Sequence, residues 1–323
     1  MTRRIFSSAL LAAVLLGASG ARADNWPSRP VRIVNTFAPG GAADMLARLI
    51  ADHMSQAFGQ RFFVETRAGA GGAIGVTSVA HTPPDGYNFA ITTFSLLVIG
   101  PLINPKLGFH PKNDLTNVAY IGGSPIVFVV NAKSDIKNLQ DFVALAKKSE
   151  KPLSYSSSGI GSNGNLISEY FAKLANIRVE HVPYKGASQG LTDLVGGHLV
   201  FSAQTLSSAS GLIRGGVLAP IAHTANARMP DYPAVPTFKE LGYPDLVSTN
   251  WFGLAGPAGL PKDIVDKMNS EVLKAVTHPD AARRLREDGM LTELLNAHAF
   301  GAFIDAEIAR WQPVIKSAGF AAQ

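Results

Sequence analysis

The sequence predicts an α/β protein with largely parallel β-sheets, preceded by an export signal. From residue 30 onward, short apolar runs alternate with amphipathic segments of helical spacing, an order that favours parallel strands covered by helices. Two strand-to-helix junctions, at residues 37–44 and 156–164, are rich in glycine or serine. The length of 323 residues makes two domains the expectation.

The composition is that of a folded protein, with 46% hydrophobic and 16% charged residues. The absence of cysteine excludes disulfides and cysteine-based metal sites. Of the 29 basic residues, Arg3, Arg4 and Arg22 lie in the first 23 residues, which leaves 26 basic against 24 acidic residues afterwards. The eight histidines show no metal-binding spacing. We therefore expect no nucleic-acid partner, no metal and no cofactor.

The N-terminus predicts a signal peptide over residues 1–23. Arg3 and Arg4 precede an apolar stretch at residues 5–16, and Ala21-Arg22-Ala23 is a small-x-small cleavage pattern. The apolar stretch is shorter than the roughly 20 residues of a membrane span. We expect cleavage after Ala23 and a soluble protein in the periplasm, while the choice between general secretion and the twin-arginine route stays open.

The first block of predicted elements covers residues 31–93. Its second element, a helix at residues 44–58, has Leu46, Ile50 and Met54 on one stripe. A Pro83-Pro84-Asp85-Gly86 turn separates its last two elements. In order, the elements are strand 31–37, helix 44–58, strand 62–65, helix 71–81 and strand 87–93.

The second block begins near residue 124, and the last third of the chain reads as helical. Asn138 is expected to cap a helix, and Pro313 to kink the last one. The predicted strands are 126–131, 153–157, 179–183, 199–203 and 220–224. The predicted helices are 139–148, 165–174, 191–195, one that begins at Pro261, and 300–315.

Both junction loops have the composition of anion-binding sites. In Pro39-Gly40-Gly41-Ala42-Ala43-Asp44, adjacent glycines can present bare N–H groups at a helix start, where Asp44 can act as a cap. The alternative is a turn that needs glycine for geometry alone. A second loop, Ser156 to Gly164, repeats the pattern. If the loops belong to different lobes, they would face each other across a cleft and bind one anionic group.

Two motifs suggest enzymes instead. Gly159, Gly161 and Gly164 match the G-x-G-x-x-G pattern of a dinucleotide-binding oxidoreductase, although the export signal and the serine-rich turn argue against it. Gly186-Ala187-Ser188-Gln189-Gly190 matches the G-x-S-x-G elbow of an exported serine esterase. No motif for an oxyanion hole accompanies it. We expect Ser188 to be a helix N-cap rather than a nucleophile.

Several motifs, in the same order, carry a resemblance to one family. They include Trp26-Pro27-Ser28-Arg29-Pro30, Ala38-Pro39-Gly40-Gly41, Gly69-Ala70-Gly71-Gly72, Pro84-Asp85-Gly86-Tyr87, Tyr155 to Ser162, His181-Val182-Pro183-Tyr184-Lys185-Gly186 and Trp251-Phe252-Gly253. Together they resemble the Bug-type extracytoplasmic solute receptors, the periplasmic binding components of tripartite tricarboxylate transporters. The resemblance covers essentially the whole mature chain.

The resemblance implies a two-lobed periplasmic binding protein of type II, a Venus flytrap, with a mixed, mainly parallel sheet in each lobe and two hinge crossovers. Lobe 1 would comprise residues 24–124 and 226–323, and lobe 2 residues 125–225. It further implies a non-enzymatic, monomeric receptor for a small organic carboxylate. The implied partners are the membrane permease subunits of a tripartite tricarboxylate transporter, or a sensor protein.

The resemblance also assigns ligand-binding residues. They are Phe37, Gly40, Gly41 and Asp44 in the first loop and Ser157, Gly159, Gly161 and Ser162 in the second, and we expect Thr93, Ser95, Gln204 and Thr205 beside them. The chain has Ala203-Gln204 where relatives often have Phe-Asp, so a carboxylate that would pair with an ammonium group is missing. This departure argues against amino acids as ligands. Dicarboxylates, tricarboxylates and aromatic acids stay open.

Overall fold

The computed structural model describes residues 26–104, 106–293 and 295–320. The predicted signal peptide and its cleavage site lie outside this part. Within it, no helix combines the length and the hydropathy that crossing a bilayer requires.

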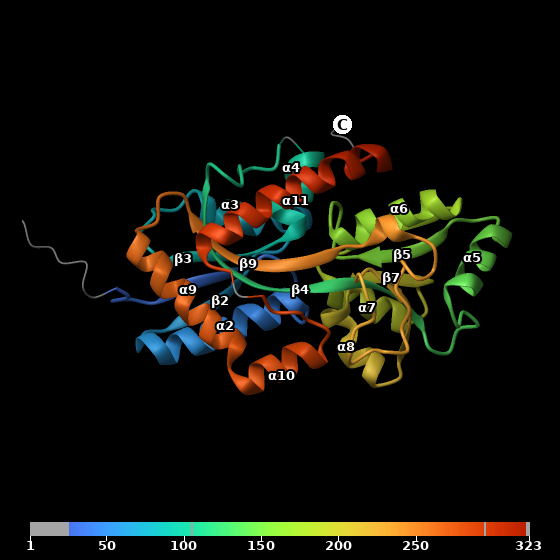
Figure 1. Cartoon of the computed structure of the whole chain (residues 1–323), viewed down its shortest axis with the longest axis horizontal. Coiled ribbons are helices and arrows are strands. Elements are labelled where there is room, and N and C mark those ends of the chain that lie inside the picture. The colour runs from blue at the N-terminus through green and yellow to red at the C-terminus, as the bar shows by residue number, and fades with distance from the viewer. Residues whose placement is uncertain (1–25, 105, 294, 321–323) are drawn as a thin grey trace, which may run out of the picture.

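Two mixed sheets share one long strand, β4 (Leu115–Asn131) (Figure 1). The sheet of lobe 1 has the order β2-β1-β3-β9-β4, with β1 (Val31–Asn35), β2 (Phe62–Thr66), β3 (Asn88–Thr93) and β9 (Thr249–Pro257). The sheet of lobe 2 continues from the second half of β4 as β4-β7-β5-β6, while β8 also pairs with β4. These strands are β5 (Leu153–Ser157), β6 (Val179–Pro183), β7 (Phe201–Thr205) and β8 (Leu218–His223).

The strand pairings confirm mixed sheets but not the expected parallel majority. In lobe 1, β1 pairs in parallel with β2 and β3, whereas β9 is antiparallel to both β3 and β4. In lobe 2, β5 pairs in parallel with β6 and β7, whereas β4 is antiparallel to β7 and β8. Each antiparallel pair includes β4 or β9, the two strands that carry the chain out of and back into lobe 1.

The helices of lobe 1 cover both faces of its sheet. Leu46, Ile50 and Met54 of α2 (Ala42–Phe58) are buried as their spacing predicted, and α2 ends at Gly59, whose φ of 65° favours glycine. A π-helical turn, η3 (Ser95–Ile99), continues into α4 (Gly100–Ile103). The others are η2 (Ala70–Gly72), α3 (Ala73–Ala80), α9 (Lys262–Thr277), α10 (Pro279–Glu287) and α11 (Ala297–Ala318), whose helical hydrogen bonding extends past Pro313.

Lobe 2 is built around an aromatic core. Phe128 of β4 lies 5.1 Å from Phe201 and 5.6 Å from Phe171 between ring centroids. Asn138 caps α5 (Leu139–Lys148) as predicted, since its side chain accepts a 2.8 Å hydrogen bond from Asp141 N. The remaining helices are α6 (Asn163–Ala175), α7 (Ala187–Val195), α8 (Leu206–Arg214) and η4 (Pro244–Leu246).

The chain between β8 and β9 packs on lobe 2, although we expected residues from 226 onward to belong to lobe 1. Met229 and Tyr232 share a buried cluster with Leu191 of α7. Phe238 lies 4.9 Å from Phe128 between ring centroids. Residues 226–236 have the composition of a loop, but the apolar side chains among them pack on lobe 2. We therefore propose that lobe 2 extends to about residue 247.

The two crossovers between the lobes lie next to each other. Ile126 N donates to Thr224 Oγ1 at 2.9 Å, and this hydroxyl donates to Ser248 O at 2.6 Å. Ser248 N in turn donates to Thr224 O at 2.9 Å. Thr224 thus connects the outgoing and the returning chain, which is the arrangement of a hinge.

Candidate functional site

The first predicted loop joins β1 to α2, and the carboxylate of Asp44 holds it together. Asp44 Oδ2 accepts from Gly40 N at 3.1 Å, and Oδ1 accepts from Asn35 Nδ2 at 3.2 Å. Arg48 forms an ion pair with the same carboxylate at 3.1 Å. The helix N-cap is Gly41, not Asp44 as predicted. Asp44 therefore supports the loop from behind.

The second predicted loop joins β5 to α6 and is also held by its own side chains. Ser162 is the N-cap of α6 and accepts from Asn165 N at 3.3 Å. Gly159 N donates to Ser157 Oγ at 3.2 Å, and Gly161 N donates to Asn165 Oδ1 at 3.1 Å. Gly159 and Gly161 have φ values of 127° and 75°, which favour glycine.

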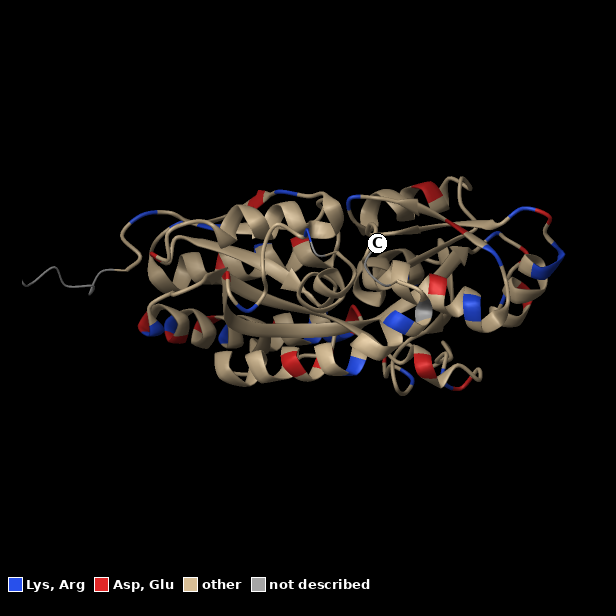
Figure 2. Ribbon diagram, turned by 90° about the horizontal axis from the view of Figure 1, so that it is seen from above, with Lys and Arg blue, Asp and Glu red and all other residues tan. Residues whose placement is uncertain are grey.

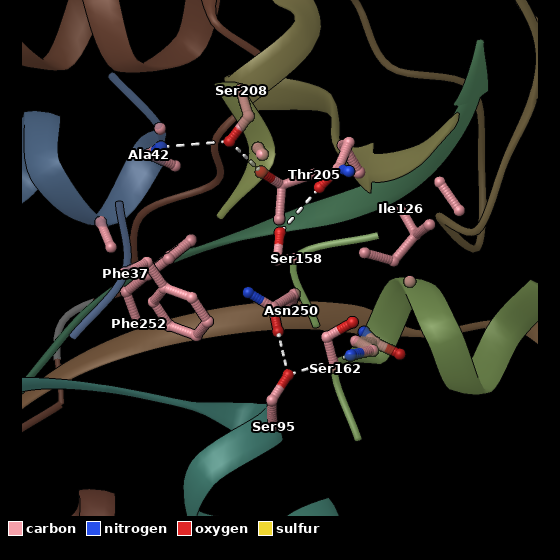
Figure 3. A pocket seen from close by; sticks show the side chains of 17 residues that line it. Phe37, Ala42, Ser95, Ile126, Ser158, Ser162, Thr205, Ser208, Asn250 and Phe252 are labelled. Carbon is pink, nitrogen blue, oxygen red and sulfur yellow. Dashed lines mark hydrogen bonds between the residues drawn. The ribbon is translucent and has the colours of Figure 1, made fainter. Parts of the chain in front are cut away.

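Both loops border one cavity between the lobes (Figure 3). It contains about 440 Å³ of space between atoms, part of it open to solvent. Its lining comes from both lobes: Phe37, Gly41, Ala42, Ala43, Ser95, Ile126, Ser158, Ser162, Asn163, Gly164, Ala187, Ala203, Gln204, Thr205, Ser208, Asn250 and Phe252. The predicted pairing of two loops across a cleft is thus present.

The predicted ligand-binding residues divide into two groups. Those that line the cavity are Phe37, Gly41, Ser95, Ser162, Gln204 and Thr205. Those outside its lining are Gly40, Asp44, Thr93, Ser157, Gly159 and Gly161. The second group shapes the loops: Thr93 Oγ1, for example, accepts from Leu96 N at 3.3 Å where η3 begins. For these residues, a contact with the ligand stays a prediction.

Eleven lining residues were not among the predicted site residues, namely Ala42, Ala43, Ile126, Ser158, Asn163, Gly164, Ala187, Ala203, Ser208, Asn250 and Phe252. Ser158 Oγ donates to Gln204 Oε1 at 2.7 Å, and Ser95 Oγ donates to Asn250 Oδ1 at 3.2 Å. A signal for Ser208 existed, because it follows a predicted strand in a serine-rich run, like the second loop. Asn250 and Phe252 lie on β9, a strand that was not predicted from the sequence.

The cavity lining offers dipoles, those of helix N-termini and those of neutral polar side chains such as Ser95, Gln204 and Asn250. None of the described residues that line it is charged. First-turn residues of four helices line it, from α2, α6, α7 and α8, which are 17, 13, 9 and 9 residues long. The first N–H groups of a helix lack partners within the helix and carry partial positive charge. Their convergence on a neutral cavity favours an anion.

One wall of the cavity is apolar. The side chains of Phe37 and Phe252 lie close together on one side, and Ile126 lies on another (Figure 3). Phe252 is 3% exposed, so this wall is well packed behind the cavity. An occupant that combines an anionic group with a carbon skeleton matches both kinds of surface.

The lobes are closed on each other around the cavity. Ala38 N donates to Lys185 O at 2.9 Å, and Ala42 N donates to Ser208 Oγ at 3.1 Å. On the opposite side of the cavity, Asn163 N donates to Ser95 Oγ at 3.0 Å. Each of these bonds joins lobe 1 to lobe 2.

The geometry does not support the enzyme alternatives. Ser188 Oγ donates to Pro39 O of lobe 1 at 2.7 Å, and the N-cap of α7 is Gly186 rather than Ser188 as predicted. At Gly161, a Cβ would lie 2.8 Å from Ile103 of lobe 1, so the G-x-G-x-x-G loop is covered where a dinucleotide would bind. Within the described residues, no cluster of three or more His, Cys, Asp or Glu could hold a metal ion.

Comparisons with known proteins agree with this architecture. Residues 46–320 match the family model described as tripartite tricarboxylate transporter family receptor. Protein BugT of Bordetella pertussis is 30% identical over 320 residues, which cover 99% of this chain and 98% of BugT.

Solved structures of similar proteins include two with bound ligands. Rpa4515 of R. palustris, solved with adipate, is 33% identical, has a TM-score of 0.88 and is matched over 92% of this chain and 100% of its own. MatC of Rhodopseudomonas palustris, solved with malate, is 30% identical, with a TM-score of 0.85 and coverage of 90% and 100%. The chain therefore belongs to the tripartite tricarboxylate transporter receptor family, whose members are periplasmic solute-binding receptors and not enzymes.

Proposed function

We propose that this receptor captures a small organic acid between its lobes. The observation that carries the proposal is the neutral cavity onto which four helix N-termini converge. Relatives solved with adipate and malate support a carboxylate as the anion. The ligand leaves chemically unchanged, because the site needs only to hold and release it.

The energetics of such a site are sufficient for capture. A hydrogen bond to a charged group contributes about 1.5–3 kcal/mol. Several such bonds to one carboxylate, after ordering costs, reach the roughly −8 kcal/mol of micromolar binding. Closure follows because the ligand contacts both lobes at once only when they are closed, so binding shifts the hinge equilibrium toward that state.

The proposal extends to cellular context. We infer that the mature protein begins after Ala23, acts in the periplasm as a monomer, and delivers its ligand to permease subunits of a tripartite tricarboxylate transporter or to a sensor. Its family supports a transporter partner. Figure 2 shows basic and acidic residues interspersed over both lobes, a distribution that suits a small ligand better than a polyanion.

A thermal-shift screen of the protein from residue 24 onward tests the proposal. We expect malate, adipate, a tricarboxylate or benzoate to raise the melting temperature, since a ligand at 100 times its Kd stabilises the native state by about 2.7 kcal/mol. Maltose, which carries no negative charge, serves as the control. A chain that none of the acids stabilises at 10 mM would contradict the proposal.

A further inference from the structure

His181 lies outside the cavity, yet it connects to the second loop through hydrogen bonds. It projects from β6 and stacks on Tyr155 of β5, with ring centroids 4.8 Å apart and planes 24° apart. Its Nε2 lies 2.7 Å from Ser157 Oγ, and its Nδ1 lies 3.3 Å from Asn165 Nδ2. Ser157 ends β5 where the second loop begins, and Asn165 lies in the first turn of α6.

The hydrogen bonds of Asn165 determine which imidazole nitrogen carries the proton. Asn165 Oδ1 accepts from Gly161 N at 3.1 Å, so its Nδ2 is the donor on the other side. This amide donates to Tyr155 Oη at 2.9 Å and faces His181 Nδ1. Nδ1 must therefore accept, which leaves the single proton of a neutral imidazole on Nε2, directed at Ser157 Oγ.

Ser157 connects His181 to the rest of the loop through hydrogen bonds. Its hydroxyl donates to Gly159 O at 3.0 Å and accepts from Gly159 N at 3.2 Å. Because one lone pair accepts from His181 Nε2, the other is shared between Gly159 N and Ser162 Oγ, which lies 3.1 Å away. Ser162 is the N-cap of α6 and lines the cavity. A chain of hydrogen bonds thus runs from His181 to the helix N-terminus that faces the cavity.

We propose that His181 is a positioning residue of the ligand site: its neutral imidazole, protonated on Nε2, sets the conformation of residues 157–162, and a second proton releases it. A proton on Nδ1 would face the hydrogens of Asn165 Nδ2. Rotating that amide would turn its donor toward Gly161 N, so either arrangement loses a hydrogen bond that holds the loop.

The environment favours the neutral form at pH 7. Burial lowers the pKa of His181 to about 4. The other titratable groups around it are Tyr155, Glu169, Lys173 and Arg178. Glu169 accepts from Tyr155 Oη at 2.6 Å, and Arg178 donates to Glu150 O at 2.6 Å, so these side chains are directed at other partners.

The inference depends on the proposed function only for its effect on affinity, because the loop conformation can be measured without ligand. The measurement is amide hydrogen exchange of Gly159 and Gly161 by NMR, corrected for intrinsic rates, at pH 7 and pH 5. When the loop opens, the pKa of His181 should rise from about 4 to its ordinary 6.5, so protonation favours the open loop. We therefore expect the protection of both amides to fall at least about tenfold between pH 7 and pH 5.

Two variants separate positioning from packing. In His181→Phe the ring can still stack on Tyr155 but makes no hydrogen bond, so protection should be low at both pH values. In His181→Gln an amide can donate to Ser157, so protection should be partly retained and independent of pH. His198→Gln, at an exposed histidine of the same lobe, should keep the wild-type response.

Wild-type protection that is equal at pH 7 and 5, or a His181→Phe protein that behaves like the wild type, would overturn the inference. Calorimetry with malate and adipate adds the functional readout: affinity should fall with loop protection in the wild type and not in His181→Gln. If neither acid binds, the proposed function fails for these ligands, while hydrogen exchange still decides the role of His181.

Discussion

His223 illustrates how burial controls the chemistry of a single residue near the hinge. It ends β8 and is fully buried. Its Nδ1 accepts from Ala225 N at 3.2 Å, whereas its Nε2 has no hydrogen-bond partner within the described residues. Burial lowers the pKa of His223 to about 4. The side chain is therefore neutral in the native state at pH 7.

This pKa predicts a specific dependence of stability on pH. The unfolded chain, with a histidine pKa near 6.5, binds more protons than the native state between pH 6.5 and 4. The stabilising contribution is thus complete above pH 6.5 and is lost as pH falls toward 4. At pH 5 the loss is about 2 kcal/mol.

His223→Asn tests this dependence, since the Asn carbonyl can accept from Ala225 N but does not titrate. Its melting temperature should fall less between pH 7 and 5 than that of the wild type. The comparison uses differences within each protein, so any cost of the smaller side chain cancels. Equal falls in both proteins would show that His223 is not protonated on unfolding in this range.

At the level of elements, the position of α6 depends on close contact with β7. Gly164 is the second residue of α6, and a Cβ there would overlap Ala203 O of β7. Gly164, which completes the G-x-G-x-x-G match, thus serves helix-to-strand packing. The contact brings the N-terminus of α6 to the cavity, which Gly164 itself lines.

Gly164→Ala has two opposing effects on the stability of the protein, and they differ in size. Helix propensity favours alanine by about 1 kcal/mol, whereas forcing a methyl group against backbone costs about 1–3 kcal/mol or more. We expect the packing cost to dominate and the melting temperature to fall. Gly211→Ala is the matched control, because this glycine lies within α8 with no atom within 4 Å of its Cβ position. A Gly164→Ala protein as stable as this control would refute the packing argument.

The elements also show what sequence patterns reveal. Amphipathic helices such as α2 and α5, and the loops after β1 and β5, could be predicted because their local signals agree with the fold. In contrast, β9 contains Gly253 and Gly256, and the first half of β4 contains Gly122 and Gly123. These residues disfavour a strand locally, yet pairing with neighbouring strands makes one. A Cβ at Gly123 would overlap Thr249 of β9.

Local sequence signals were also insufficient to predict the whole lining of the cavity. The predicted residues that line the cavity lie at ends of elements that were predicted, whereas Asn250 and Phe252 belong to β9. Which loop residues face the cavity and which support it from behind also could not be predicted. Asp44 and Gly41 are only three positions apart, yet Gly41 lines the cavity whereas the Asp44 carboxylate accepts hydrogen bonds from Gly40 and Asn35 outside its lining.

For the whole molecule, closure brings backbone segments of the two lobes into direct contact. Gly186 of lobe 2 lies against Ala38 of lobe 1: a Cβ there would lie 2.8 Å from Ala38 N and 2.9 Å from Ala38 Cβ. The φ of Gly186 is 168°, extended backbone that any residue adopts. The absence of a side chain is therefore needed for the closed arrangement and not for the local conformation.

Gly186→Ala should accordingly weaken ligand binding while leaving each lobe intact. A methyl group in this contact costs about 1–3 kcal/mol in the closed state only, so the Kd should rise roughly tenfold or more. Calorimetry measures the affinity, and the melting temperature without ligand checks the fold, with Gly211→Ala again as the control. Unchanged affinity would mean that closure does not require the contact between Gly186 and Ala38.

In the proposed function, helix N-termini rather than charged side chains bind a carboxylate between the lobes. Gly41 allows a direct test, because its φ is −94° and a Cβ there would lie 3.7 Å from Ser208 Oγ, an ordinary contact. Gly41→Asp places a negative charge in the cavity, at an N-cap position where aspartate favours the helix. Gly41→Asn adds nearly the same shape without the charge.

Calorimetry of both variants, with the acid that stabilises the wild type most, is the decisive measurement. We expect Gly41→Asp to retain its melting temperature but to lose binding, whereas Gly41→Asn should bind within a few fold of the wild type. Equal affinity of the two variants would contradict the proposed function, because a carboxylate bound at these N-termini cannot tolerate a second negative charge beside it.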